Sequence, residues 1–250
     1  MKPSAVLLDL SGTLHLDAAV IPGAIESVRR LREAGIAVRA VSNTSRRTRA
    51  SLVALLLQMG FDFAADEILT APLAARRWIE MRGHRPFLLV HENLLPEFAG
   101  IDTRAPDAVL VADAGDGFHY ENLNAAFRLL MDGAPLLATG MNRHFRDRDA
   151  LSLDAGPFVR ALEFAAATRA VLTGKPSREF FHSALDGLGC EPAEAVMIGD
   201  DAENDVAGAI RAGMRGILVK TGKYRTGDET AAAGGDCVAD IRAAVDCLLG

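Results

Sequence analysis

The chain has 250 residues, of which 50% are hydrophobic and 24% are charged, so it has enough apolar material for one large domain or two smaller ones. Its formal net charge of −6 lacks the basic surplus that nucleic-acid-binding proteins carry. No stretch approaches the ~18 consecutive apolar residues that a membrane span needs. The composition therefore predicts a globular protein that binds neither nucleic acid nor membrane.

The first seventy residues alternate between apolar runs and amphipathic segments. A buried strand is predicted at 5–10 and breaks into a loop at 11–13. A helix follows after Pro22-Gly23 and closes near Gly35. A second strand at 36–41 and a helix at 46–59 complete a β-loop-α-β-loop-α pattern, which is typical of a doubly wound sheet.

The middle of the chain has β and α elements of its own. Strands are predicted at 87–90, 108–111 and 135–138, and a helix at 122–131. A segment of this length is too long for a loop within one domain, so residues 73–170 are predicted to form an inserted α/β domain.

The doubly wound pattern returns after the insert. Strands and helices alternate again, at 170–173, 179–188, 195–198, 206–212, 216–219 and 241–249. Residues 1–72 and 171–250 are therefore predicted to form one α/β core, a Rossmann-like doubly wound parallel sheet interrupted by the inserted domain.

Polar motifs follow four of the predicted strands, and the carboxyl ends of strands in an open parallel sheet form the edge where ligands bind. At the first, Asp9 ends an apolar strand, and Gly12 and Thr13 follow in a loop whose backbone N–H groups are expected to form an anion-binding nest. A carboxylate in this place can attack phosphorus and form an aspartyl phosphate. The alternative is that Asp9 is a turn or capping residue.

Phosphate-binding groups follow two further strands. Ser42 and Asn43 can donate to phosphate oxygens, or else cap the next helix. Lys175, held between Gly174 and Pro176, can offset phosphate and carboxylate charge, or else be an ordinary surface lysine.

An acidic cluster follows the strand at 195–198. Asp200, Asp201 and Asp205 place several oxygen atoms close together, which is costly unless a hard cation shares the site or the residues form a solvated helix cap. Mg²⁺ suits such a site because it binds few carboxylates and keeps water and substrate oxygens. The sequence therefore predicts a Mg²⁺ site.

These motifs, in this order, resemble the four motifs of the haloacid dehalogenase-like (HAD) hydrolase superfamily. The place of the insert is similar to the large α/β (C2-type) cap class of that superfamily. Within the class, the segments 112–127, 153–157, 197–201 and 221–224 resemble the phospholysine phosphohistidine inorganic pyrophosphate phosphatase group.

The resemblance implies a role for each matching residue. Asp9 would be the nucleophile and a Mg²⁺ ligand, with the backbone carbonyl of Ser11 as a second ligand. Asp200 would bind the metal directly, and Asp205, with Asp201 as a further candidate, would hold metal-bound water. The resemblance also implies that Ser42, Asn43 and Lys175 bind the phosphoryl group, that the cap closes over the site and sets specificity, and that two copies pair through the cap as a homodimer.

Ser11 departs from the superfamily pattern, which has a second aspartate at this position to protonate the leaving group. A hydroxyl cannot replace that acid near neutral pH, and general acid–base catalysis is typically worth about 10²–10⁴-fold in rate. Alkyl phosphates need the acid most, because an alkoxide is a poor leaving group. Ser11 therefore favours pyrophosphate or phosphoramidate substrates, including phosphohistidine and phospholysine in a phosphoprotein.

Three other functions stay open at this stage. A broad small-metabolite phosphomonoesterase and a weakly active regulatory or binding protein both fit the motifs, whereas a metal-independent dehalogenase fits poorly with the acidic cluster. The beginning of the chain lacks a signal-peptide pattern before Asp9, and the three cysteines have no metal-binding spacing, so a cytoplasmic location is expected.

Overall fold

The computed structural model describes residues 2–147, 150–232 and 234–250 and divides into two units. The first unit contains the chain up to Ser42, Ala50–Leu69 and Lys175–Gly250, and the second contains Asn43–Arg49 and Thr70–Gly174. The sequence predicts boundaries after residues 72 and 170, whereas the units change after residues 69 and 174. That the insert is a separately folding domain stays a prediction.

A six-stranded sheet in the order β14-β13-β12-β1-β4-β5 forms the centre of the first unit within the described residues. β1 pairs with β4 and β12, β12 with β13, and β13 with β14, all in parallel. The strands are β1 (Ala5–Asp9), β4 (Ala37–Ser42), β5 (Ile68–Thr70), β12 (Ala195–Gly199), β13 (Arg215–Val219) and β14 (Asp236–Val238). A short hairpin, β2 (His15–Leu16) with β3 (Ala19–Val20), follows β1.

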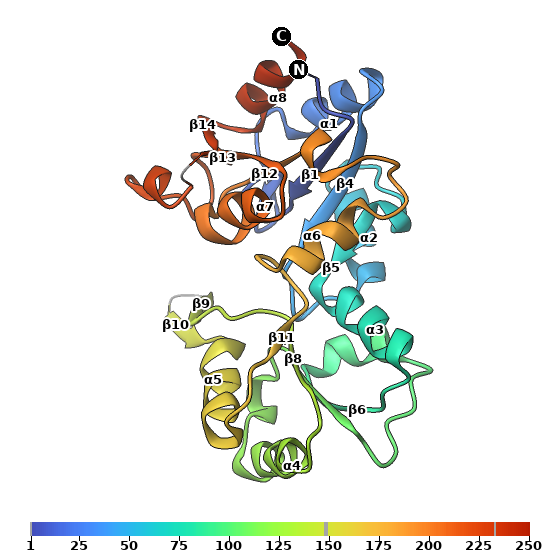
Figure 1. The fold of residues 1–250 in the computed structure, drawn as a ribbon. Helices are drawn as coiled ribbons and strands as arrows, with labels where there is room; N and C mark the ends of the chain where they lie inside the picture. Colours follow the sequence, from blue (N-terminus) through green and yellow to red (C-terminus); the bar gives the residue numbers. More distant parts are fainter. Residues whose placement is uncertain (1, 148–149, 233) are drawn as a thin grey trace. The chain divides into compact units, whose positions relative to one another are not determined.

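Helices cover both faces of this sheet, and Figure 1 shows their arrangement. Alternate strand residues such as Val6, Leu8 and Ile198 face one side, where they pack with α1 (Ala24–Glu33), α2 (Arg49–Gln58) and α8 (Ile241–Leu249). On the other side, Leu218 packs with Ala202 and Val206 of a π-helical turn at Ala202–Ala207. Because both faces are covered, the central strands read as continuous apolar runs; all five residues of β1 are buried. The remaining helices of this unit are α6 (Arg178–Leu185) and α7 (Gly208–Arg211).

The second unit has its own four-stranded sheet among the described residues, in the order β11-β8-β7-β6. Its strands are β6 (Pro86–Leu89), β7 (Ala108–Val111), β8 (Leu136–Ala138) and β11 (Val171–Leu172), and adjacent strands are parallel. The helices α3 (Ala71–Arg82), α4 (Tyr120–Met131) and α5 (Ala155–Ala166) flank this sheet, and β9 (His144–Asp147) pairs with β10 (Ala150–Leu153) in a separate antiparallel sheet.

The predicted α/β class, with a doubly wound parallel core and a second α/β part, is confirmed. One strand assignment is wrong: the run at 170–173 forms β11, which pairs with β8 of the second unit and not with the core sheet. Its short apolar sequence carries no information about which of two sheets it joins. Within the described residues, no helix has the length and apolar content needed to cross a membrane.

Candidate active site

Three adjacent strands of the core sheet bring polar residues to one edge. Asp9 is the last residue of β1, Ser42 is the last residue of β4, and Asp200 directly follows β12. Because these strands lie side by side in the order β12-β1-β4 and run parallel, their carboxyl ends lie at the same edge of the sheet. The predicted convergence of the first, second and fourth motifs at this edge therefore has a direct cause in the strand order.

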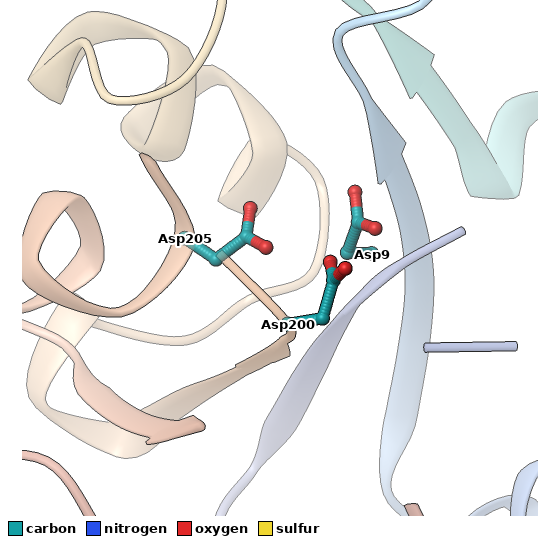
Figure 2. Close-up of side chains that lie close together, drawn as sticks. All are labelled: Asp9, Asp200 and Asp205. Carbon is teal, nitrogen blue, oxygen red and sulfur yellow. The ribbon is translucent and has the colours of Figure 1, made fainter. Parts of the chain in front are cut away.

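Three buried carboxylates meet at this edge. Asp9, Asp200 and Asp205 are only 6%, 2% and 1% exposed, and one oxygen from each lies within 4.8 Å of the others. Figure 2 shows the three side chains pointing toward a common space. Charged groups buried this deeply require a compensating positive charge.

Lys175 supplies part of that positive charge. Its side chain is 4% exposed, and its ammonium group donates to Oδ1 of Asp9 and lies 2.6 Å from Oδ1 of Asp205. Burial by itself would lower the pKa of Lys175, but the charges of Asp205 and Asp9 outweigh it and raise that pKa. Lys175 therefore stays protonated. Lys175 lies in the segment between β11 and α6. Since β11 pairs with β8 in the sheet of the second unit, Lys175 does not follow a strand of the core sheet.

One lysine does not neutralise three carboxylates. Burial, followed by the charge of Asp9, raises the pKa of Asp200 to about 7. Burial also raises the pKa of Asp205 to about 7, with Lys175 opposing the shift and the neighbouring aspartates adding to it. A hard divalent cation would remove this repulsion, and a set of three convergent carboxylate oxygens fits such a cation.

Asp201 takes a different place from Asp205, although both belong to the same acidic run. Oδ1 of Asp201 accepts a hydrogen bond of 2.9 Å from the backbone N–H of Asn204 and so caps the π-helical turn. That turn carries Asp205 inward, where its Oδ2 accepts from the Asp201 N–H at 3.2 Å. Burial opposes ionisation of Asp201, but the charge of Lys223 and the hydrogen bonds from Asn204 outweigh it and lower its pKa. Asp201 therefore lies beside the three buried carboxylates of Asp9, Asp200 and Asp205 without joining them.

Gly12 lies in the loop where the anion nest is predicted, and phosphate binding by this loop stays a prediction. Its backbone N–H donates to the carbonyl of His15 at 2.7 Å, so this one amide is engaged within the loop. Gly12 also allows close packing: a Cβ added there would lie 2.0 Å from Oδ2 of Asp200, and its φ of +94° is one that glycine adopts without strain.

The other predicted phosphate-binding residues fall in different places. Thr13 is fully buried, and within the described residues its hydroxyl has no hydrogen-bond partner, so its predicted contact with phosphate stays a prediction. Ser42 is buried at the sheet edge, and Ser11, two residues after Asp9, is exposed. Asn43 follows Ser42 but belongs to the second unit, where a Cβ added at Gly174 would lie 2.6 Å from its Oδ1.

The loop after β13 also contacts the site, although no site residue is predicted there from the sequence. The hydroxyl of Thr221 donates to the carbonyl of Gly12, and the N–H of Lys223 donates to Oδ2 of Asp200 at 2.6 Å. The sequence does contain a signal for this loop. Residues 216–219 are predicted as a core strand, residues 220–223 follow it directly, and residues beyond the carboxyl ends of parallel strands are expected near the ligand site.

Known proteins and family models are similar to this chain over nearly its whole length. A haloacid dehalogenase-like hydrolase model matches residues 6–104, and a HAD-hydrolase-like model matches residues 172–244. The chain is 53% identical over 225 residues to haloacid dehalogenase-like hydrolase domain-containing protein 2 of Bos taurus, covering 90% of this chain and 87% of that protein. It is 46% identical over 230 residues to phospholysine phosphohistidine inorganic pyrophosphate phosphatase of Bos taurus, covering 90% and 85%. The structure of a p-nitrophenyl phosphatase from Archaeoglobus fulgidus matches with a TM-score of 0.91 at 26% identity, over 99% of this chain and 100% of that one.

Proposed function

Because the chain belongs to the haloacid dehalogenase-like hydrolase family, we propose that it is a Mg²⁺-dependent phosphatase that transfers a phosphoryl group to Asp9 and then to water. One observation carries the proposal. A carboxylate suited to attack phosphorus lies beside two further buried carboxylates and a buried ammonium group. This combination supplies a nucleophile, metal ligands and a cation for the transferred phosphoryl group.

The metal would be held by Asp9, Asp200 and the backbone carbonyl of Ser11, with Asp205 binding metal-bound water. When bound, Mg²⁺ supplies positive charge that lowers the repulsion between the attacking carboxylate and the phosphate. Lys175 donates to one oxygen of Asp9 and so orients the other. The hydroxyls of Ser42 and Thr13 are in buried positions suited to donate to phosphoryl oxygens.

The substrate class we propose is pyrophosphate or a phosphoramidate. Ser11 provides no carboxylic acid for the leaving group, so substrates whose leaving group needs little protonation are favoured. A relative that is 46% identical is named for phospholysine, phosphohistidine and inorganic pyrophosphate, which agrees with this chemistry.

A broad phosphomonoesterase is the second candidate. The observation in its favour is the likeness to a p-nitrophenyl phosphatase over the full length of the chain. An aryl ester leaves as a stabilised phenolate, so turnover of such a substrate would not by itself require an acid at position 11.

Phosphate release from a panel of substrates tests both candidates. The panel contains pyrophosphate (P–O–P), imidodiphosphate (P–N–P), glycerol phosphate (an alkyl ester) and p-nitrophenyl phosphate (an aryl ester). We expect release that requires Mg²⁺, stops in EDTA and is fastest, as kcat/KM, for pyrophosphate or imidodiphosphate. Faster release from glycerol phosphate would replace the first candidate with the second, and release that survives EDTA would exclude a metal-dependent mechanism.

A cytoplasmic location and a homodimer through the inserted part stay predictions. Sedimentation of the purified chain at several concentrations tests the second, because a dimer dissociates on dilution.

A further inference from the structure

The loop formed by Thr221, Gly222 and Lys223 packs directly against Asp200, one of the three buried carboxylates of the acidic cluster Asp9, Asp200 and Asp205. Thr221 contacts the nucleophile loop through the Gly12 carbonyl, and the Lys223 N–H holds Oδ2 of Asp200. A Cβ added at Gly222 would lie 2.1 Å from Oδ2 of Asp200, so the backbone there leaves no room for a side chain. The position of the Lys223 backbone beside the cluster is therefore closely defined.

The side chain of Lys223 extends from this backbone toward solvent. Its Nζ lies 3.3 Å from Oδ2 of Asp201, and the side chain is 63% exposed, whereas Lys175 is 4% exposed and enclosed by Asp9 and Asp205. An exposed ion pair of this kind is weak, and a more highly charged anion can displace the carboxylate. Lys223 is therefore a cation at the border of the cluster that can change partners.

Charge balance indicates the partner. Asp9, Asp200 and Asp205 carry three negative charges when ionised, and Lys175 together with the proposed divalent cation would supply three positive charges against them. A diphosphate adds a second phosphoryl group with its own negative charge. Because Lys175 is enclosed by carboxylates at the nucleophile, that second group needs another cation.

We propose that the ammonium group of Lys223 leaves Asp201 and binds the departing phosphate of a pyrophosphate-type substrate. The inference rests on the phosphatase function proposed above and makes Lys223 a residue that determines specificity for the leaving group. It also fits Ser11, because charge neutralisation by an ammonium group stabilises a departing phosphate without a proton transfer.

The only reactants are the diphosphate and water. One oxygen of the ionised Asp9 attacks the nearer phosphorus of HP₂O₇³⁻, a new P–O bond forms, and the bridging P–O bond breaks with its electron pair leaving on HPO₄²⁻. The proton already present on the distal phosphate stays there, and Lys223 binds this product. Water then attacks the aspartyl phosphate, which releases H₂PO₄⁻ and restores the carboxylate of Asp9.

The test is the kcat/KM for pyrophosphate divided by that for p-nitrophenyl phosphate, whose leaving group carries no phosphate. Lys223→Gln keeps the backbone N–H that holds Asp200, and we expect it to lower this ratio about ten-fold, the effect of losing one hydrogen bond to a charged group. Lys223→Arg should restore most of the ratio. Lys220→Gln is the matched control, because Lys220 pairs with Glu229, outside the cluster, at 3.3 Å.

The outcomes separate this inference from the function on which it rests. If the wild-type protein hydrolyses pyrophosphate and Lys223→Gln has the same kcat/KM ratio as wild type, the proposed role of Lys223 is overturned. The proposed phosphatase function is then unaffected. An equal loss on both substrates together with a higher Mg²⁺ half-saturation also overturns it, since that is the mark of a structural role. A wild-type protein that hydrolyses only p-nitrophenyl phosphate overturns the proposed substrate class itself, and this inference with it.

Discussion

The burial of Asp200 and Asp205 predicts how the stability of the metal-free protein depends on pH. The pKa of each lies at about 7 in the folded chain, against an ordinary value of 3.8. The folded state therefore keeps protons that the unfolded chain has already released. The stabilising contribution is complete below pH 3.8 and is lost as the pH rises through about 7, so stability falls as the pH rises across this range.

The size of the effect follows from the same linkage. Each pH unit over which one proton is kept is worth about 1.4 kcal/mol, so titration of Asp205 between about pH 5.5 and 7 lowers the free energy of unfolding by about 2 kcal/mol. Asp205→Asn removes this titration and adds a pH-independent cost, the lost contact with Lys175. We expect the advantage of wild type over the variant to shrink by about 2 kcal/mol from pH 5.5 to 8.

Urea unfolding in EDTA at several pH values between about 5.5 and 8 measures this difference directly. A parallel series with Mg²⁺ should show greater stabilisation by the metal at the higher pH, because protons then no longer compete for the carboxylates. A wild-type advantage that is independent of pH would contradict the raised pKa of Asp205, as would equal stabilisation by Mg²⁺ at both ends of the range.

Three further predictions concern the nucleophile loop. Asp9→Asn is expected to lower turnover at least about a thousand-fold with an unchanged circular dichroism spectrum. Asp62→Asn, at an exposed position, is the control and should leave turnover unchanged. A rate of Asp9→Asn within about ten-fold of wild type would mean that Asp9 is not the nucleophile. Ser11→Asp is expected to raise the kcat/KM for glycerol phosphate relative to pyrophosphate by about ten- to a hundred-fold, because it restores an acid; a constant ratio would show that protonation of the leaving group does not limit the alkyl ester. Gly12→Ala places a Cβ 2.0 Å from Asp200 Oδ2 and should raise the Mg²⁺ half-saturation at least about ten-fold. Gly35→Ala, also at positive φ but with nothing within 4 Å, should cost only about 1–2 kcal/mol of stability, and the same rise in half-saturation in both variants would contradict the steric argument.

Much of the core could be predicted from local patterns. The runs that form β1, β4, β12 and β13 are apolar because helices cover both faces of the sheet, and this leaves a plain signal in the sequence. The edge strands β5 and β14, three residues each, and the β9–β10 hairpin leave no such signal and were not predicted. β11 was predicted as a strand, but the assignment to its sheet was wrong, because a two-residue strand contains too few side chains to specify its neighbours.

The residues of the candidate site could likewise be predicted only in part. Asp9, Ser42 and Asp200 could be placed from the rule that polar residues at parallel strand ends converge. The rule does not separate Asp201 from Asp205, since both lie in one acidic run, and only the π-helical turn decides that Asp205 faces Asp9 while Asp201 faces Lys223.

The type of chemistry can be inferred from local features of the chain: a carboxylate at a strand end, a lysine between Gly174 and Pro176, an acidic run after a buried strand, and a serine in place of the expected acid. These are local properties, because the apolar pattern of each segment identifies a strand and thereby shows which polar residues follow it. Which charged groups come into contact depends on the three-dimensional fold. Asp9 and Lys175 are 166 positions apart, and sheet order and packing, which no local pattern encodes, bring them into contact.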